Sequence, residues 1–310
     1  MRSSRAWLSL LLLAGSAALG LAVGPGGFGF GVGPEIMAIR LPRVLVGGLV
    51  GINLALSGAI LQSILKNPLA DPGIIGISAG AGLAAMVIMI LFPAQAALLP
   101  PAAFAGAIGA ALIIYFIAYD GSAHTLRLVL AGVALSAFLG AFMSTLTVLY
   151  SDRVQGTVNW MAGALIGKSW THLYMVLPYT VFGLVGAVVG SRYLNILALG
   201  DDIARGLGLS VERVKFLLTL LAALLAASAV SAVGLLGFVG LIIPHISRLL
   251  IGSDNRFLIP FSAVFGAVTV IFADTAARVL FSPYELPVGI IMAFVGAPFF
   301  LYLLARGIKS

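Results

Sequence analysis

Charged residues are rare in this sequence, and they divide the chain into long apolar stretches. The charge-free stretches run over 6–34, 44–65, 72–119, 128–151, 169–191, 216–247, 257–273 and 286–305. A charge near the centre of a bilayer costs at least about 2.5 kcal/mol, and an α-helix needs about 20 apolar residues to cross the hydrocarbon core. Each stretch is therefore predicted to hold at least one membrane-spanning helix.

Two of these stretches are long enough for two helices. Pro93, Pro100 and Pro101 lie near the middle of 72–119 and predict a turn there, because proline interrupts a helix. The stretch 216–247 is predicted to break around its glycines at 234 and 237. Only 9% of the residues are charged, against about 25% in soluble domains. We therefore expect an all-α, polytopic transmembrane bundle of about ten spans, forming a single domain over 1–310.

Basic residues predict the orientation of the spans, because cytoplasmic loops collect lysine and arginine. With a cytoplasmic N-terminus, twelve of the 17 basic residues lie inside: Arg2, Arg5, Lys66, Arg127, Arg192, Arg205, Arg213, Lys215, Arg248, Arg256, Arg306 and Lys309. The five outside are Arg40, Arg43, Arg153, Lys168 and Arg278. Both termini are thus predicted to be cytoplasmic, in a multi-pass protein of the cell membrane. The inside bias also accounts for the net charge of +7 without a nucleic-acid partner.

The N-terminal apolar run has two interpretations. Arg2 and Arg5 precede it, as in a secretory signal peptide. The run from Ala6 to Val23 is longer than a usual signal core, and removing it would leave an odd number of spans. We therefore interpret it as the first span.

Catalytic and metal-binding patterns are missing from the sequence. There is no cysteine, no His-Glu-x-x-His, no Gly-x-Ser-x-Gly and no Walker A loop, so the chain is not expected to be an enzyme or to hydrolyse ATP itself. His124, His172 and His245 are scattered at different depths. Asp274 is the only acid well inside a predicted span, and Arg278 lies four residues further on, where the two charges would pair locally. No cofactor or metal is implied.

Two connections are predicted to contain short helices. The run 158–166, which includes Trp160, is typical of a helix lying on the outer membrane surface. The longest inside connection, 192–215, is predicted to hold a helix over 203–207, capped by Asp201 or Asp202 and ended by Gly208. Ser210 is then expected to cap the next span.

Several motifs, in order along the chain, carry a family resemblance. They stand at 40–43 (RLPR), 57–62 (SGAILQ), 67–73 (NPLADPG), 237–245 (GFVGLIIPH), 273–274 (AD), 285–289 (ELPVG) and 296–300 (GAPFF). Together they resemble the FecCD-type permease family, the membrane subunits of ABC importers for iron-siderophores, haem and vitamin B12. The resemblance covers nearly the whole chain.

The resemblance implies a permease that works by alternating access, with an iron-siderophore as the expected cargo and haem or vitamin B12 as alternatives. Its expected partners are a second permease subunit, identical or similar, two cytoplasmic ATPase subunits that hydrolyse the ATP, an external substrate-binding protein and membrane lipid. A stand-alone secondary transporter is the alternative from another class, and it would need an ion-coupling acid in the membrane, for which only Asp274 is available.

The resemblance also implies roles for particular residues. Arg40, Arg43 and Arg278 match arginines that face outward and dock the binding protein; snorkelling at a helix end is the plain alternative for the first two. The sequence 199–208 matches the element that couples to the ATPase, with Gly200, Asp201, Asp202, Ala204, Arg205, Gly206 and Gly208. Asn67, Pro68 and Leu69 match an inner gate, or form an ordinary tight turn. The pathway candidates are Ser136, Ser144, Thr145, Asn159, Trp160 and Met161, although each of them can equally serve in packing.

Overall fold

The computed structural model of the chain describes residues 2–24, 27–28, 34–73, 76–118 and 125–305. In this part of the chain, six helices are long and apolar enough to cross a membrane, and four shorter apolar helices accompany them. The helices of these spans are α1 (Arg2–Ala22), α2 (Pro34–Ile64), α3 (Ile77–Leu91), α4 (Leu99–Ala118), α5 (Thr125–Leu149), α7 (Trp170–Ala198), α9 (Val211–Val233), α10 (Val239–Ile251), α11 (Asn255–Val279) and α12 (Val288–Ala305). The predicted all-α bundle of about ten spans is confirmed.

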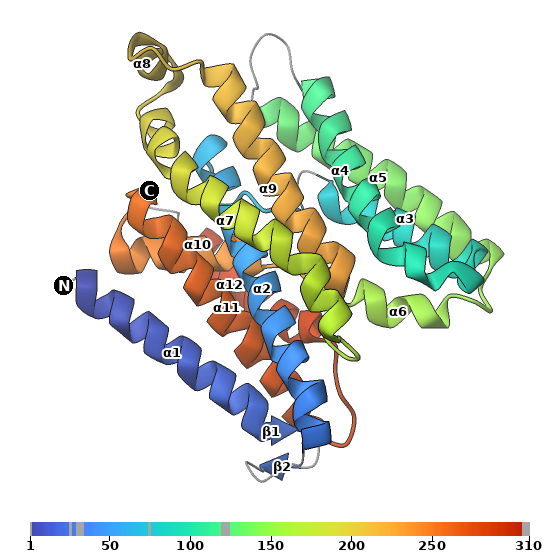
Figure 1. Ribbon diagram of the computed structural model, residues 1–310. Helices are drawn as coiled ribbons and strands as arrows, with labels where there is room; N and C mark the ends of the chain where they lie inside the picture. The colour runs from blue at the N-terminus through green and yellow to red at the C-terminus, as the bar shows by residue number, and fades with distance from the viewer. Residues whose placement is uncertain (1, 25–26, 29–33, 74–75, 119–124, 306–310) are drawn as a thin grey trace.

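The remaining elements are short and lie between the spans. They are β1 (Val23–Gly24), β2 (Gly27–Phe28), the 3-10 helix η1 (Pro93–Leu98), α6 (Gln155–Met161) and α8 (Asp201–Gly206). The two strands pair antiparallel. Figure 1 shows α8 and the start of α1 toward one side of the bundle, and β1, β2 and α6 toward the other. We call these the α8 side and the α6 side.

Both predicted breaks inside the long apolar stretches are present. The first lies at η1, which Pro93 opens, whereas Pro100 and Pro101 lie in the first turn of α4 and not in the turn itself. Proline is tolerated there because the first N–H groups of a helix have no partner within it. The second break follows Val233, where Gly234 adopts a φ of 83° that favours glycine.

The two short helices differ from their predictions in detail. The helix predicted over 158–166 lies earlier, at Gln155–Met161, and Gly163 follows it with a φ of 70°. The helix expected to be capped by Asp201 or Asp202 starts at Asp201, with Gly200 as the N-cap residue and no side-chain cap. Ser210 is the N-cap residue of α9 as predicted, but its side chain makes no capping hydrogen bond. Asp201 and Asp202 in the first turn of α8 interact favourably with the helix dipole, although neither side chain caps the helix.

Helix α2 forms the centre of the bundle, and 83% of its most apolar window is buried. It packs against α7, α9, α10 and α11, as Figure 1 shows. Two contacts are between backbones: a Cβ on Gly51 would overlap the carbonyl oxygen of Gly266, and a Cβ on Gly58 would overlap that of Gly240. Small residues therefore allow α2 to approach α11 and α10 closely.

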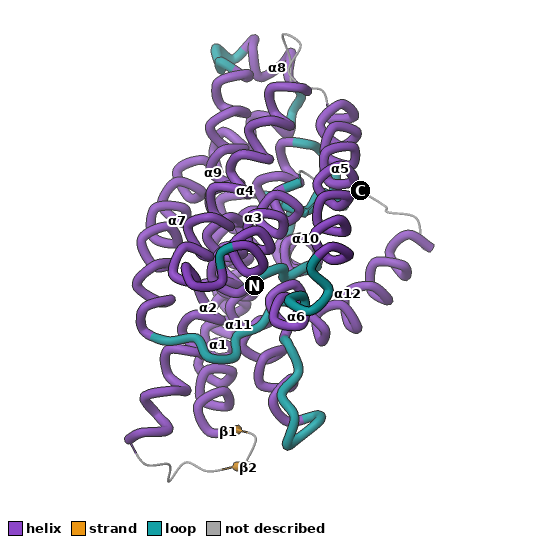
Figure 2. The backbone as a smooth tube through the Cα atoms, turned by 90° about the vertical axis from the view of Figure 1, so that its right-hand side faces the viewer, coloured by secondary structure: helices purple, strands orange, loops and turns teal. Residues whose placement is uncertain are grey.

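Helices α5 and α12 expose most of their apolar side chains. Only 11% of the most apolar window of α5 is buried. Phe138 on α5 is 60% exposed and Phe294 on α12 is 75% exposed. Figure 2 shows these two helices on the same side of the molecule. This side carries an apolar surface that the single chain leaves uncovered.

Candidate functional site

A buried cluster of charges joins α2 to α11 on the α6 side. Arg43 on α2 forms a forked ion pair with Asp274 on α11, with Nη2 and Nε at 2.9 and 3.0 Å from the two carboxylate oxygens. Its Nη1 contacts Oε2 of Glu285, just before α12, at 2.7 Å. Arg278 lies one turn after Asp274 and contacts the same carboxylate at 3.2 Å. Asp274 is thus the shared acceptor of two arginines.

Two arginines of this end also bind the carbonyl groups at the end of α1. Arg278 Nη1 donates to the carbonyl oxygens of Gly20 and Val23 at 3.0 and 3.1 Å. Arg40 Nη1 donates to that of Leu21 at 2.9 Å. The last carbonyls of a helix lack partners within it and attract cations. These bonds hold α1 against α2 and α11.

The expected exposure of the three docking arginines is wrong for two of them. Arg43 is 8% exposed and Arg278 is 1% exposed, because both are drawn inward by Asp274. Arg40 is half-buried. The local pairing of Asp274 with Arg278 is confirmed. Docking of a partner at this end remains a hypothesis. The long-range pair between Arg43 and Asp274 was not predicted, because no local spacing reports it.

On the α8 side, the 66–73 turn contains the predicted inner gate. Lys66 begins it with a φ of 48°, which is unusual for a residue with a side chain. Asn67 accepts the N–H of Leu69 on its side-chain oxygen at 2.9 Å, and Asp71 accepts that of Gly73 at 2.8 Å. Local side-chain bonds of this kind stabilise turns. The role of Asn67, Pro68 and Leu69 as an inner gate stays a prediction.

Gln62, at the end of α2, connects the turn to α10. Its amide nitrogen lies 3.2 Å from the carbonyl oxygen of Ala70 and 3.1 Å from that of Gly240, and its amide oxygen accepts a hydrogen bond from Arg248. The side chain is 2% exposed. Gln62 was not predicted as a site residue, although a polar side chain inside an apolar span is a signal of a special role.

Asp201, the first residue of α8, connects this helix to two other elements. Lys215 of α9 contacts its carboxylate at 2.5 Å, and Lys66 of the turn contacts it at 3.3 Å. Burial alone would raise the pKa of Asp201, but the hydrogen bonds and charges of Lys215 and Lys66 outweigh it and lower that pKa. The carboxylate is therefore ionised and holds α8 to the turn.

The faces of α8 differ from the predicted arrangement of the coupling element. Ala204 is fully buried against the rest of the chain, so it does not offer a close-packing surface to a partner. Arg205 is paired with Glu212 at 2.9 Å and with Asp202 at 3.2 Å. The outer face carries Ile203, 56% exposed, and Leu207, 64% exposed. These two side chains were missed, because the sequence alone did not show which face of so short a helix is covered.

The pathway candidates differ in how far they are exposed in the single chain. Ser144 and Thr145 on α5 and Asn159 on α6 are exposed, while Ser136 and Met161 are half-buried and Trp160 is buried. The Thr145 hydroxyl donates to its own helix, at the carbonyl oxygen of Ala141. Their role as pathway residues stays a prediction.

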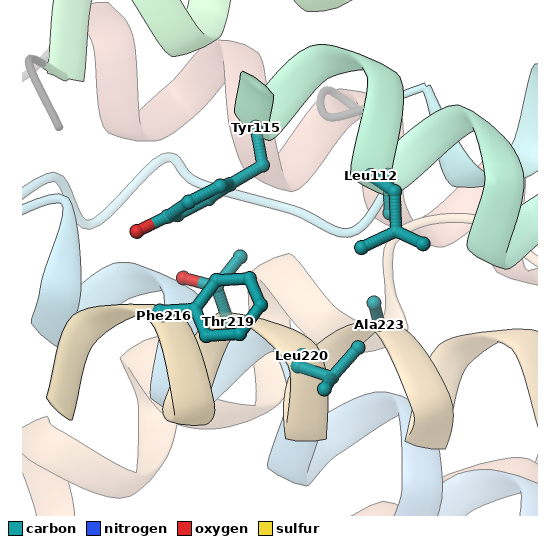
Figure 3. Close-up of a pocket in the computed structure, with 7 residues that line it drawn as sticks. Leu112, Tyr115, Phe216, Thr219, Leu220 and Ala223 are labelled. Atoms are coloured by element: carbon teal, nitrogen blue, oxygen red, sulfur yellow. The ribbon is translucent and has the colours of Figure 1, made fainter. Parts of the chain in front are cut away.

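A cavity between α4 and α9 is too small to hold a cargo molecule. Figure 3 shows Tyr115 and Leu112 facing Phe216, Thr219, Leu220 and Ala223 across it. Its volume is about 10 Å³, which is room for about one water molecule. The rings of Tyr115 and Phe216 lie 5.0 Å apart. This cavity is a gap in helix packing.

Asp71 makes stability depend on pH. Burial raises its pKa to about 6, while the N–H of Gly73 opposes the shift. Between the ordinary aspartate pKa near 4 and about 6, the folded chain binds more protons than the unfolded chain, so this contribution is complete below that range and is lost as pH rises through 6. We expect the apparent Tm to fall over this range, and Asp71→Asn to remove that part of the fall in a thermal-shift series. An unchanged profile would contradict the assignment.

The comparisons with known proteins agree with one another. The model of the FecCD transport family matches residues 32–306. The Fe(3+)-citrate import system permease protein YfmD of Bacillus subtilis is 40% identical over 88% of this chain and 81% of its own length. The cobalamin import system permease protein BtuC of Halobacterium salinarum is 44% identical, over 86% of this chain and 72% of its own length.

A solved structure is similar over almost the whole chain. It is an inward-facing conformation of a transporter assigned to the metal-chelate type of ABC transporters. The TM-score is 0.89 with 29% sequence identity, and the match covers 99% of this chain and all of the other. Both the helical order and the packing described above therefore have a close counterpart.

Proposed function

This chain belongs to the FecCD transport family, and on that premise we propose that it is the membrane pathway of an ATP-driven importer for an iron-siderophore-type chelate. The observation that carries the proposal is the match of the family over 32–306 together with the close structural similarity to a metal-chelate type transporter. Haem and vitamin B12 are alternative cargoes. The whole chain acts as one transmembrane domain, and the ATP is hydrolysed by partner subunits.

The ion pairs of Asp274 argue against the alternative of a secondary transporter. Such a transporter needs a membrane acid that is free to bind and release a coupling ion. Asp274, the predicted candidate, accepts bonds from both Arg43 and Arg278 and is 2% exposed. Releasing it would leave two buried arginines without their partner, which is costly.

The α8 side is proposed to face the cytoplasm. There, the α8 helix of each permease subunit binds one of the two ATPase subunits. Ile203 and Leu207 would enter the ATPase surface, and Asp201 would transmit the movement to the 66–73 turn through Lys66. Gly200, with a φ of 116°, and Gly208, with a φ of 83°, allow the chain to turn at both ends of α8. Movement of α8 would then move the 66–73 turn, which contains Asn67, Pro68 and Leu69, and so open or close the inner end of the pathway.

The uncovered apolar side with α5 and α12 is the proposed contact with a second permease subunit. Large exposed apolar patches mark contacts with protein or lipid. Pairing two subunits across α5 would place Ser136, Ser144 and Thr145 near the shared axis, as a weakly polar pathway for the chelate. The other exposed faces, including those of α7 and α9, remain in lipid.

The function is tested by reconstitution. The permease is co-purified with candidate ATPase subunits and placed in liposomes with a candidate binding protein carrying a radioactive iron chelate. We expect a stable complex and uptake that requires ATP. Failure to form a complex, combined with uptake that persists without ATP, would contradict the importer assignment.

Arg40 gives the docking proposal its test, since Arg43 and Arg278 are buried. We expect Arg40→Glu to weaken association of the binding protein about threefold to tenfold at low ionic strength, and less at high salt, because the contact is electrostatic. Surface plasmon resonance measures the affinity. Arg153→Glu, at an exposed arginine elsewhere on the α6 side, is the control. Equal affinities of the two variants would remove Arg40 from the docking surface.

A further inference from the structure

A polar cavity of about 470 Å³ opens on the α8 side, beside the 66–73 turn. It lies between the ends of α2, α7 and α10 and the start of α11. The described residues that line it are Gln62, Ser63, Lys66, Asn67, Pro68, Ala198, His245, Arg248, Leu249, Ser253 and Asn255. This volume falls in the range of small-molecule sites, which is about 300–1,000 Å³.

The charges of this cavity are unbalanced. Its lining carries two cationic side chains, Lys66 and Arg248, and no aspartate or glutamate is among its described lining residues. Lys66 has a partner in Asp201, outside the cavity. Arg248 is half-buried, and within the described chain no carboxylate lies within ion-pair distance of it. An arginine withdrawn from water without a carboxylate is costly unless another anion approaches it.

Hydrogen-bond donors surround this unpaired charge. One N–H of Arg248 donates to Gln62, which leaves four of the five N–H groups of the guanidinium. The side chain of Lys66 is 43% exposed. The amide oxygen of Asn67 is used within the turn, so its amide N–H groups are available. Guanidinium, ammonium and amide donors together match the oxygens of a carboxylate.

We propose that this polar cavity binds an oxyanion, and that its ligand is the carboxylate part of an anionic chelate leaving the pathway at the inner gate. The inference rests on the proposed function for the identity of the ligand, but the cation cluster stands independently of it. It narrows the cargo to chelates that carry carboxylates, such as an iron–citrate complex, and disfavours a ligand without them. The cations would draw the chelate past Asn67 and Pro68 once the gate opens.

The test is a titration of citrate into the assembled transporter in nanodiscs of phosphatidylcholine, without ATP, followed by calorimetry. Citrate is expected to bind, and its trimethyl ester, which has the same skeleton without charge, is not. Arg248→Gln is expected to weaken citrate binding tenfold or more, because a charge-assisted fork is lost. Arg256→Gln, at an arginine already paired with Asp254, is the control and should bind citrate normally.

A second pair of variants tests the charge even if Arg248→Gln does not fold. Lys66→Gln and Asp201→Asn both break the same ion pair. Only the first removes a cation from the cavity, so citrate binding should weaken in Lys66→Gln and stay equal or improve in Asp201→Asn. Equal losses in both variants, or equal binding of the ester, would overturn the proposal.

Two further arms separate the sources of the anion. Citrate should bind with the same affinity in nanodiscs that contain phosphatidylglycerol as in nanodiscs of phosphatidylcholine. Loss of citrate binding in phosphatidylglycerol would assign the cavity to lipid headgroups and overturn the proposal. If ATP-driven uptake of a chelate is found but citrate does not bind, the cavity inference fails and the proposed function stands. Citrate binding without any chelate uptake would keep the oxyanion site and reject the proposed function.

Discussion

Asp274→Ala is expected to destabilise the purified permease by about 3–5 kcal/mol, because it leaves Arg43 and Arg278 buried without their shared carboxylate. Both arginines are less than one-tenth exposed, so water cannot replace the lost partner. The change should also loosen α1, whose last carbonyls are held by Arg278. The apparent Tm in detergent, together with denaturant unfolding of the same variant, measures the effect.

The matched control for this variant is Asp152→Ala. Asp152 is paired with Arg153 at 3.8 Å, but its side chain is 78% exposed. Exposed pairs contribute about 0–1 kcal/mol, so little change is expected. If the two variants lose similar stability, the cluster around Asp274 is not the structural centre of the α6 side.

Ile203→Asp combined with Leu207→Asp is expected to reduce ATP-driven uptake at least tenfold while the permease remains folded. Both side chains are exposed, Ile203 within α8 and Leu207 directly after it, so the fold loses little contact. Placing two carboxylates in an apolar interface carries the desolvation cost of charges that lack partners. Uptake in proteoliposomes, measured with co-purification of the ATPase subunits, should show both losses together.

The apolar pair Ile203→Val and Leu207→Met is the control for this double variant. It keeps the apolar character of the outer face and should keep uptake near the original rate. Full ATPase association of the acidic variant would show that α8 is not the contact. By contrast, a large residue at Ala204 would disturb the permease itself, because Ala204 is buried within it.

The spans were predictable because the bilayer imposes a strict rule on the sequence. Charges are excluded from its interior, so gaps between charges recovered the helices from α1 to α12, and Pro93 and Gly234 marked the breaks. The ends of α6 and α8 were less predictable. The ends of a short helix are set by single residues such as Gly200 and Gly163. Several neighbouring residues in the sequence were equally good candidates for the cap.

The site was predictable only in part, since a sequence shows which side of the membrane a charge is on but not what it contacts. Arg43 and Asp274 are 231 residues apart, yet they form the centre of the cluster on the α6 side. Gln62 and Arg248 meet across 186 residues to border the polar cavity. No local spacing reports such pairs, because they follow from how α2 packs against α10 and α11.

The sequence by itself determined the membrane-spanning class, the approximate number of helices and the family. These properties follow from composition, from the order of the motifs and from the cost of placing charge in hydrocarbon. Only the tertiary structure decided that two of the three outer arginines are buried partners of Asp274, and that Ala204 faces inward while Ile203 and Leu207 face outward. It also decided that Arg248 lines a cavity with no carboxylate within ion-pair distance among the described residues. The physical reason is that burial and charge pairing depend on contacts between helices, and those contacts exist only after the chain has packed.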